Sequence, residues 1–312
     1  MKKRRRKIRT GRLLLVIIIP LLLMALLIAG AATLFRRPEK EDTPIEEILD
    51  NRIDYSLMQE LDLDLYSDKY LLMRLNDLKV LYGKNIDEEF YPASLTKLLT
   101  LDAVLSNTDD LEDTSSFSQS ELDELIVANA SLAGLEPEKE YTVRELLYAL
   151  VLPSGADAAR ALENYFRSMD KDLVNEMNRI IERLSLRHSH FTNTTGLHDN
   201  DLYTSLDDYA RILIDTLEKD EAKSLVKSLF HELDDGTVLR STLSSLGNNG
   251  IVEVYGGKTG FTGEAGENIV VFYSYENRSY MLILAGAPGN PYMGETIISV
   301  MLPIFLNICI IN

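Results

Sequence analysis

The hydrophobic and polar positions of this chain are strand-like near both ends and follow a helical period in between. Residues 70–74 and 78–82 are short apolar runs joined by a polar turn, which predicts a β-hairpin. From about residue 101 to residue 220, apolar side chains mostly recur at helical spacing between polar loops. Strand-like segments then return at residues 251–262, 268–275 and 279–287.

This order of elements predicts one antiparallel sheet built from both ends of the chain and faced by a mainly helical subdomain. Residues 293–310 form a further apolar segment, long enough for a helix that covers one face of the sheet. We therefore expect an α/β protein of the α+β kind, with helices flanking the sheet. With 312 residues, of which 46% are hydrophobic, the chain is long enough to bury a large core.

A tight connection between two helices is predicted around Ser154. Residues 143–150 form an amphipathic pattern that stops at Pro153, because proline cannot continue a helix. Asp157 is expected to cap a second helix, from residue 158 to about residue 166. A loop held between two helices is a suitable place to present a hydroxyl group to a cleft.

The N-terminal segment has the pattern of a membrane anchor. Eight of the first 12 residues are basic, and residues 13–35 carry no charge before Arg36 and Arg37. A helix of these 23 residues spans roughly 35 Å, enough for a hydrocarbon core of about 30 Å. Residues 29–31 could also form a signal-peptidase site, but the length of the segment and the second basic pair favour an uncleaved anchor.

The basic start is expected to stay in the cytoplasm, which places the rest of the chain outside the membrane. The predicted arrangement is therefore a single-pass protein of the cell membrane with an extracytoplasmic domain. Its parts are a cytoplasmic tail (1–12), a transmembrane anchor (13–35), a polar linker (36–56) and a folded domain (57–312).

Beyond residue 37 the chain is strongly acidic, with 22 basic side chains against 49 acidic ones. The resulting net charge of −27 disfavours nucleic acid as a partner, since phosphate groups attract basic surfaces. Cys309 is the only cysteine, so no disulfide bond can form within the chain.

A serine and a lysine three residues apart are the first candidates for chemistry. Pro92 favours a helix start, so Ser94 and Lys97 fall near the first turn of a helix with a largely apolar face. Side chains at positions i and i+3 are neighbours on a helix. A lysine can take the proton of a serine hydroxyl only if burial or a nearby cation lowers its pKa toward neutrality. We expect the surrounding leucines to supply that burial.

Two further segments give this pair its significance. Residues 153–157 read Pro-Ser-Gly-Ala-Asp, and residues 256–260 read Gly-Gly-Lys-Thr-Gly in a strand-like region. An isolated serine and lysine would more simply be a helix cap and a solvated charge. A Ser-x-x-Lys pair, a loop serine and a late Lys-Thr-Gly triplet, in that order, are instead the three signatures of penicillin-recognising serine enzymes.

With these elements placed, the chain resembles the serine-type D-alanyl-D-alanine carboxypeptidases, which are low-molecular-mass penicillin-binding proteins. The resemblance extends over roughly residues 70–289. Beyond the three signatures, longer stretches are similar to segments of that family, at residues 141–159, 191–199, 203–210 and 257–262. It implies a β-lactamase/transpeptidase-like fold, peptidoglycan stem peptides ending in D-Ala-D-Ala as partners, and β-lactams as covalent inhibitors. We expect no cofactor and no metal ion.

The resemblance implies a covalent mechanism centred on Ser94. Ser94 would be acylated by the penultimate D-alanine of the stem peptide, with Lys97 as the proton acceptor. Ser154 would relay the proton to the amine of the departing D-alanine. Water would then hydrolyse the acyl-enzyme, so that the overall reaction is removal of the terminal D-alanine.

Further residues would bind the substrate. The resemblance assigns Lys258, Thr259 and Gly260 to this role, with the lysine and the threonine holding the terminal carboxylate. As a second cation, the lysine would also help to keep the catalytic amine neutral. The backbone N–H groups of Ser94 and Phe261 would meet the developing oxyanion, and loss of such a donor typically costs about 3 to 4 kcal/mol.

One position departs from the family pattern. The second signature is usually serine, any residue, asparagine, but its third position here is Ala156, whose side chain has neither donor nor acceptor. In the family, that asparagine helps to position the lysine and the substrate. Either a neighbouring group takes its place or turnover is weakened.

Other functions use some of the same residues. A weakened site would acylate and stall, or only bind stem peptides, as a cell-wall binding or sensing module. A D,D-endopeptidase or a β-lactamase would use the same site, although a β-lactamase commonly needs a glutamate on a dedicated loop that the sequence does not identify. His188, His190, His198 and Asp199 raise the alternative of a zinc peptidase, but their spacing does not match a two-histidine helix motif.

Overall fold

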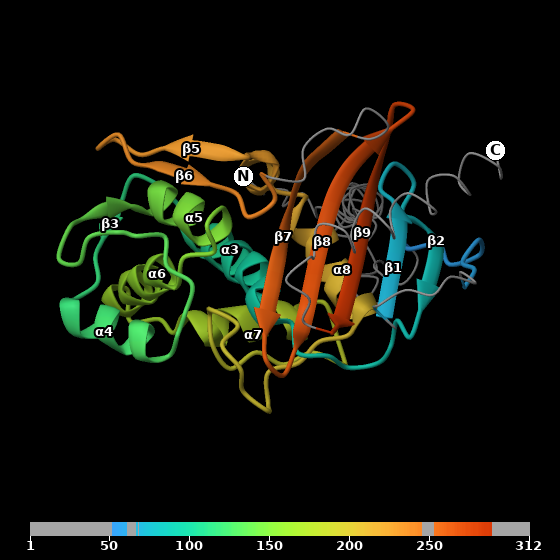
Figure 1. Ribbon diagram of the computed structural model, residues 1–312, viewed down its shortest axis with the longest axis horizontal. Coiled ribbons are helices and arrows are strands. Elements are labelled where there is room, and N and C mark those ends of the chain that lie inside the picture. Colours follow the sequence, from blue (N-terminus) through green and yellow to red (C-terminus); the bar gives the residue numbers. More distant parts are fainter. Residues whose placement is uncertain (1–51, 61–66, 68, 245–252, 289–312) are drawn as a thin grey trace, which may run out of the picture. The chain divides into compact units, whose positions relative to one another are not determined.

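The computed structural model describes residues 52–60, 67, 69–244 and 253–288, which are drawn in colour in Figure 1. The predicted cytoplasmic tail, the membrane anchor and most of the linker lie outside these residues, as does the apolar segment 293–310. Within the described part of the chain, no helix is both long and apolar enough to cross a membrane.

A five-stranded antiparallel sheet is built from both ends of the described chain, as predicted. Its strands are β1 (Lys69–Arg74), β2 (Lys79–Lys84), β7 (Glu253–Thr262), β8 (Gly266–Tyr275) and β9 (Arg278–Ala287). Their order in the sheet is β2-β1-β9-β8-β7 (Figure 1). Pairing of β1 with β9, with Leu71 opposite Ile283, joins the N-terminal hairpin to the later strands.

Side chains alternate between the two faces of this sheet, because successive residues of a strand point in opposite directions. In β8, Val270 and Phe272 pack into the same core as the helices. Val271 and Tyr273 belong to a second apolar cluster on the other face. Both faces are therefore apolar, which explains why the strands read as nearly continuous hydrophobic runs.

The predicted helical subdomain is confirmed. The α-helices of the described chain are α3 (Thr96–Asn107), α4 (Gln119–Val127), α5 (Val143–Val151), α6 (Ala156–Ser168), α7 (Leu173–Arg183), α8 (Leu206–Thr216) and α9 (Asp220–Lys227). Figure 1 shows α3, α4, α5 and α6 gathered beyond strand β7, with α8 behind the sheet. Helix α3 lies inside this subdomain, since residues 96–104 are all buried.

Shorter elements connect these parts. A 3₁₀ turn, η1 (Ala93–Leu95), leads directly into α3. Two small two-stranded antiparallel sheets complete the described fold. One pairs β3 (Thr114–Ser115) with β4 (Tyr141–Thr142), which follows α4 in the chain, and the other is a hairpin of β5 (Phe230–Glu232) and β6 (Val238–Arg240). The hydrophobic pattern does not predict these short strands, because strands of two or three residues are too short to display an alternation.

The expectation that Asp157 caps a helix is wrong. Helix α6 begins at Ala156 and Gly155 is its N-cap residue, so Asp157 lies inside the first turn. Its side chain is fully buried and accepts hydrogen bonds from backbone N–H groups at residues 133–135. The carboxylate therefore binds chiefly this loop, and within its own helix it accepts a bond from the Ala158 N–H at 3.0 Å.

Packing of the folded domain begins slightly before residue 57. Ile53 is 5% exposed and belongs to the main core. The backbone of Asp54 also pairs with the hairpin, since its N–H donates to the Leu78 carbonyl oxygen and its carbonyl accepts from Val80, both at 2.9 Å. The end of the expected linker is thus part of the packed structure.

Candidate active site

Ser94 lies in η1, in the turn that leads into α3. The preceding residue, Ala93, has a φ angle of +49°, which is costly for a residue other than glycine. A close backbone approach accompanies this conformation, because a Cβ atom on Gly196 would lie 1.8 Å from the Ala93 carbonyl oxygen. Glycine at this position lets a second loop press against the turn that carries the serine.

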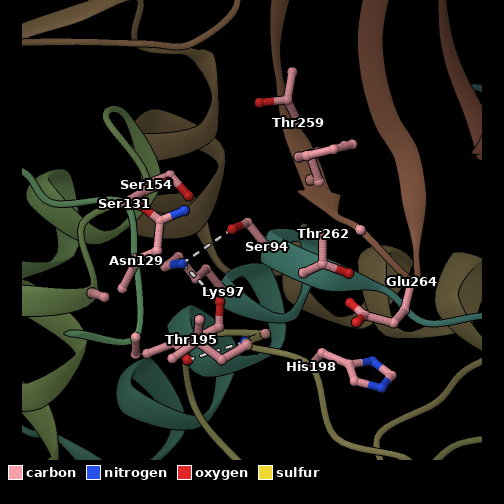
Figure 2. A pocket seen from close by; sticks show the side chains of 18 of the residues that line it. Ser94, Lys97, Asn129, Ser131, Ser154, Thr195, His198, Thr259, Thr262 and Glu264 are labelled. Atoms are coloured by element: carbon pink, nitrogen blue, oxygen red, sulfur yellow. Dashed lines mark hydrogen bonds between the residues drawn. The ribbon is translucent and has the colours of Figure 1, made fainter. Parts of the chain in front are cut away.

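Lys97 lies in the first turn of α3, and its side chain returns to Ser94 (Figure 2). Its Nζ is 3.2 Å from Ser94 Oγ and donates a hydrogen bond to the Thr195 carbonyl oxygen at 2.7 Å. Burial lowers the pKa of the Lys97 amine to about 7, against the opposing effect of the Asp157 carboxylate. A large fraction of this amine is therefore neutral near pH 7 and able to accept a proton.

The carbonyl group of Thr195 is fixed by the side chain of Asn193. Asn193 Oδ1 accepts from the backbone N–H groups of Thr195 at 3.1 Å and Gly196 at 2.7 Å, and Nδ2 donates to the Leu197 carbonyl oxygen at 3.0 Å. Such bonds from asparagine to nearby backbone define a tight turn. The sequence places this turn in a family-like segment but does not reveal its contact with Lys97, 98 positions away.

Ser154 reaches the same cleft from the connection between α5 and α6. Its φ angle is +68° and it is 4% exposed. Among the described residues, its Oγ has no hydrogen-bond partner. A buried hydroxyl without a protein partner is costly, and because Ser154 lines the cleft, its hydroxyl is available to a bound ligand. Figure 2 shows Ser154 on the same side of the cleft as the Lys97 amine.

Lys258 is not among the residues that line the described cleft. Its side chain is fully buried, and Nζ donates to the carbonyl oxygen of Thr259 at 2.8 Å. Burial lowers the pKa of the Lys258 amine well below its ordinary value, and the positive charge of Lys97 lowers it further. The charge of Lys97 therefore acts on Lys258, whereas burial and the Asp157 carboxylate account for the pKa of Lys97.

The remainder of the Lys-Thr-Gly segment forms the opposite wall of the cleft. Thr259 Oγ1 donates to Thr242 Oγ1 at 2.8 Å, and both threonines line the cleft. Gly260 allows β7 to approach η1, because a Cβ atom there would lie 3.0 Å from the backbone nitrogen of Ser94. Phe261 follows at the end of β7, with a side chain that is 58% exposed. The strand backbone thus lies directly beside the nucleophile's turn.

These elements enclose a cleft of about 750 Å³. The helical wall carries Ser94, Lys97 and Ser154, and the strand wall carries residues 259–261. The cleft is also lined by His198, which the sequence raised only as a zinc ligand, and by residues to which the sequence assigns no role, namely Asn129, Ser131, Thr195, Thr242 and Glu264. These residues come from loops far apart in the sequence, so no spacing rule could bring them together before the fold is known.

The histidines considered as metal ligands take other partners. Nδ1 of His190 lies 2.7 Å from the carbonyl oxygen of Asp201, and the ring of His198 packs edge-on against Tyr91 with centroids 4.7 Å apart. Over the described ranges, no three His, Cys, Asp or Glu side chains are grouped so that they could hold a metal ion. His190 thus contacts a backbone carbonyl and His198 an aromatic ring, and both side chains belong to exposed residues.

Comparison with known proteins finds sequence relatives that are named D-alanyl-D-alanine carboxypeptidases. D-alanyl-D-alanine carboxypeptidase DacF of Bacillus subtilis (strain 168) is 30% identical over 191 residues, which are 60% of this chain and 49% of that protein. The D-alanyl-D-alanine carboxypeptidase of Streptomyces sp. (strain K15) is 28% identical over 232 residues, 71% of this chain and 75% of the relative. The chain thus spans about half the length of the first of these relatives.

A solved structure and a family model agree with these relatives. The crystal structure of the Streptomyces K15 DD-transpeptidase matches with a TM-score of 0.68 and 23% identity, over 77% of this chain and 97% of that one, which establishes a shared fold. The family model for D-alanyl-D-alanine carboxypeptidases, peptidase S11, matches residues 56–288. Since this match extends over nearly all of the described fold and includes all three signatures, the chain belongs to the S11 family of D-alanyl-D-alanine carboxypeptidases.

Proposed function

We propose that this chain is a serine-type D-alanyl-D-alanine carboxypeptidase that removes the terminal D-alanine from peptidoglycan stem peptides. One observation carries the proposal, which is the Lys97 amine with a pKa of about 7 at 3.2 Å from the Ser94 hydroxyl. Membership of the S11 family and the names of the relatives support the substrate class.

In the acylation step, Ser94 Oγ attacks the carbonyl carbon of the penultimate D-alanine while the Lys97 amine takes the hydroxyl proton. The oxyanion is stabilised by the backbone N–H groups of Ser94 and Phe261, at the close approach of β7 to η1. The C–N bond then breaks, and the proton passes from Lys97 through the Ser154 hydroxyl to the leaving amine. The products are free D-alanine and an ester on Ser94.

In the deacylation step, water attacks the ester carbonyl carbon while Lys97 takes one of its protons. The bond between this carbon and Ser94 Oγ breaks, and the serine recovers its proton from Lys97. The shortened stem peptide leaves with a new carboxylate. A β-lactam would acylate Ser94 by the same first step, with its ring amide as the bond that opens.

We assign the terminal carboxylate of the substrate to the wall formed by Thr259 and Gly260. The Thr259 and Thr242 hydroxyls supply hydrogen bonds there. A bound carboxylate raises the pKa of a neighbouring amine and favours its protonation. The buried Lys258 amine, next to this wall, therefore supplies positive charge when the substrate is bound. Binding of the carboxylate thus favours the charged form of Lys258, which burial disfavours.

A second candidate is a module that acylates and stalls, and Ala156 is the observation that favours it. This residue lines the cleft, is 1% exposed and offers only a methyl group to a substrate. A D,D-endopeptidase or a β-lactamase would use the same residues on other substrates, so turnover assays with each substrate separate these activities.

The deciding experiment measures D-alanine release from a stem pentapeptide by the full chain in detergent, beside the Ser94→Ala variant. Release that depends on Ser94 supports the carboxypeptidase. Covalent labelling by a fluorescent penicillin that persists for hours, without release of D-alanine, would support the stalled module and contradict the carboxypeptidase.

The membrane arrangement also belongs to the proposal. Its parts are the cytoplasmic tail (1–12), the anchor (13–35), a linker that starts at residue 36, and an extracytoplasmic domain whose packing begins at Ile53. We expect the full chain to sediment with membranes and its domain to be degraded by protease added outside spheroplasts. Resistance of the domain to that protease would contradict this topology.

A further inference from the structure

The loop at residues 128–135, between α4 and β4, forms part of the cleft wall and is anchored on the start of α6. The buried carboxylate of Asp157 accepts hydrogen bonds from backbone N–H groups at residues 133–135, at 2.9 to 3.1 Å. In addition, the backbone N–H of Ala156 donates to the Ser131 carbonyl oxygen at 2.8 Å. The loop is therefore held against Ala156, the position at which the second signature usually has an asparagine.

Asn129 terminates α4 in a left-handed conformation, with a φ angle of +52°. Its backbone N–H donates to the Ile126 carbonyl oxygen, and that of Ala130 donates to the Leu125 carbonyl oxygen, both at 3.0 Å. This is the Schellman pattern, whose left-handed residue is usually glycine and sometimes asparagine. The helix end thus requires only a left-handed backbone conformation at this position, which glycine would also adopt. It does not use the Asn129 side chain.

The side chain of Asn129 points into the cleft, where it lies beside Ser131 and Ser154 on the Lys97 side (Figure 2). Asn129 is an exposed residue, and among the described residues its carboxamide forms no hydrogen bond. It is also the only carboxamide among the side chains that line this cleft. Its donor and acceptor are therefore free for a ligand.

A bound peptide needs such a group. Its backbone N–H and C=O groups lose water on entering the cleft, and each one left without a partner weakens binding. A carboxamide offers both a donor and an acceptor, whereas the methyl group of Ala156 offers neither. Asn129 lies on the loop that is hydrogen-bonded to Ala156, on the same wall as Ser154.

We propose that Asn129 is a substrate-binding residue of this site, and that its carboxamide hydrogen-bonds to the backbone of the D-alanyl peptide where Ala156 offers only a methyl group. This inference rests on the proposed function and extends it. It explains how a chain with alanine in its second signature can turn over substrate. It also gives Asp157 a positioning role, because Asp157 holds the loop that carries Asn129.

The variant that tests the proposal is Asn129→Gly, because glycine keeps the left-handed helix end and removes only the carboxamide. We expect kcat/KM for D-alanine release, and the rate of acylation by a penicillin, to fall about 10-fold to 100-fold. The melting temperature should remain that of the wild type. Asn277→Gly is the matched control, since Asn277 also has a positive φ angle, of +60°, and does not line the cleft.

The double variant Asn129→Gly, Ala156→Asn tests the replacement directly. An asparagine at position 156 should restore most of the lost rate, because the amide then comes from the second signature itself. A rate for Asn129→Gly within twofold of the wild type would overturn the proposal, as would a double variant as slow as Asn129→Gly. If the wild type releases no D-alanine, the proposed function fails, while the acylation rates of these variants still decide the role of Asn129.

Discussion

Each of the two elements that form the cleft walls, helix α3 and strand β7, carries a buried lysine, and the two lysines differ in what they contact. Lys97, on the helical wall, lies against the Ser94 hydroxyl and the Thr195 carbonyl oxygen. Lys258, in strand β7, donates to the backbone of Thr259 and does not line the described cleft. Burial lowers the pKa of both amines.

Burial alone therefore does not make a lysine a catalytic base. The neutral amine must also lie within hydrogen-bond reach of the hydroxyl that it deprotonates, and only Lys97 meets this second condition. In the proposed mechanism, the helical wall makes and breaks bonds, and the strand wall holds the terminal carboxylate of the substrate. This division predicts that damage to the first wall lowers kcat and that damage to the second raises KM.

The largest effect is expected for Ser94→Ala, which removes the nucleophile from the helical wall. Penicillin labelling should disappear, and D-alanine release should fall by a factor of about 10⁴ or more. Because the strand wall is intact, the dissociation constant of the stem peptide, measured by calorimetry, should change less than about threefold. Ser131→Ala is the control, since it removes another hydroxyl from the same cleft. Wild-type release by Ser94→Ala would refute the mechanism.

The next largest effect is expected for Lys258→Met, which replaces the buried amine by an apolar side chain of similar length. Loss of a charged partner for the substrate carboxylate should lower kcat/KM about 10-fold to 100-fold, chiefly through KM. A substrate whose terminal carboxylate is amidated should be affected much less. An equal loss for both substrates would show that Lys258 does not act on the carboxylate.

The rate of acylation of Ser94 should change about tenfold with pH. Below a pH of about 7 the Lys97 amine binds a proton and cannot accept one from Ser94, so the acylation rate should rise about tenfold between pH 6 and pH 8. The measurement is the rate of acylation by a penicillin at saturating enzyme across this range. A rate that falls with rising pH would contradict the assignment of Lys97 as the base.

The same profile in Lys258→Met sharpens the comparison of the two lysines. A midpoint that moves to higher pH would show that Lys258 carries a positive charge in the free enzyme, because removal of a neighbouring cation raises the pKa of Lys97. An unchanged midpoint would show that Lys258 is neutral there. The two results therefore distinguish a charged Lys258 from a neutral one before substrate binds.

The smallest effect is expected for Thr259→Val, which removes one neutral hydroxyl from the strand wall. The loss of a single hydrogen bond to the carboxylate should raise KM about threefold to tenfold and leave kcat nearly unchanged. Thr242→Val should have a similar effect, since the two hydroxyls are hydrogen-bonded to each other. A fall in kcat with unchanged KM would instead place these hydroxyls on the bond-breaking side of the cleft.

Much of the fold could be predicted because it depends on local patterns. The hairpin of β1 and β2 and the three later strands follow from short apolar runs with turns between them, and the structure confirms both. The proximity of Ser94 and Lys97 also follows from the sequence, because side chains three positions apart on a helical turn are neighbours. Asp157 shows the limit of such reasoning. The local sequence predicts a helix cap, but the carboxylate accepts hydrogen bonds from three backbone N–H groups of a loop that is distant in sequence.

The sequence by itself therefore determined the strands of the main sheet, the helical character of the middle of the chain and the order of the three signatures, and it supplied the candidate nucleophile and base. Only the tertiary structure decided how deeply Lys97 is buried, that it meets Thr195, that Lys258 lies beneath its wall and that Asn129 faces the cleft. The physical reason is the distance along the chain over which each property is set. Periodicity and spacing act over a few residues, whereas burial, pKa and the lining of a cleft depend on segments that only the folded chain brings together.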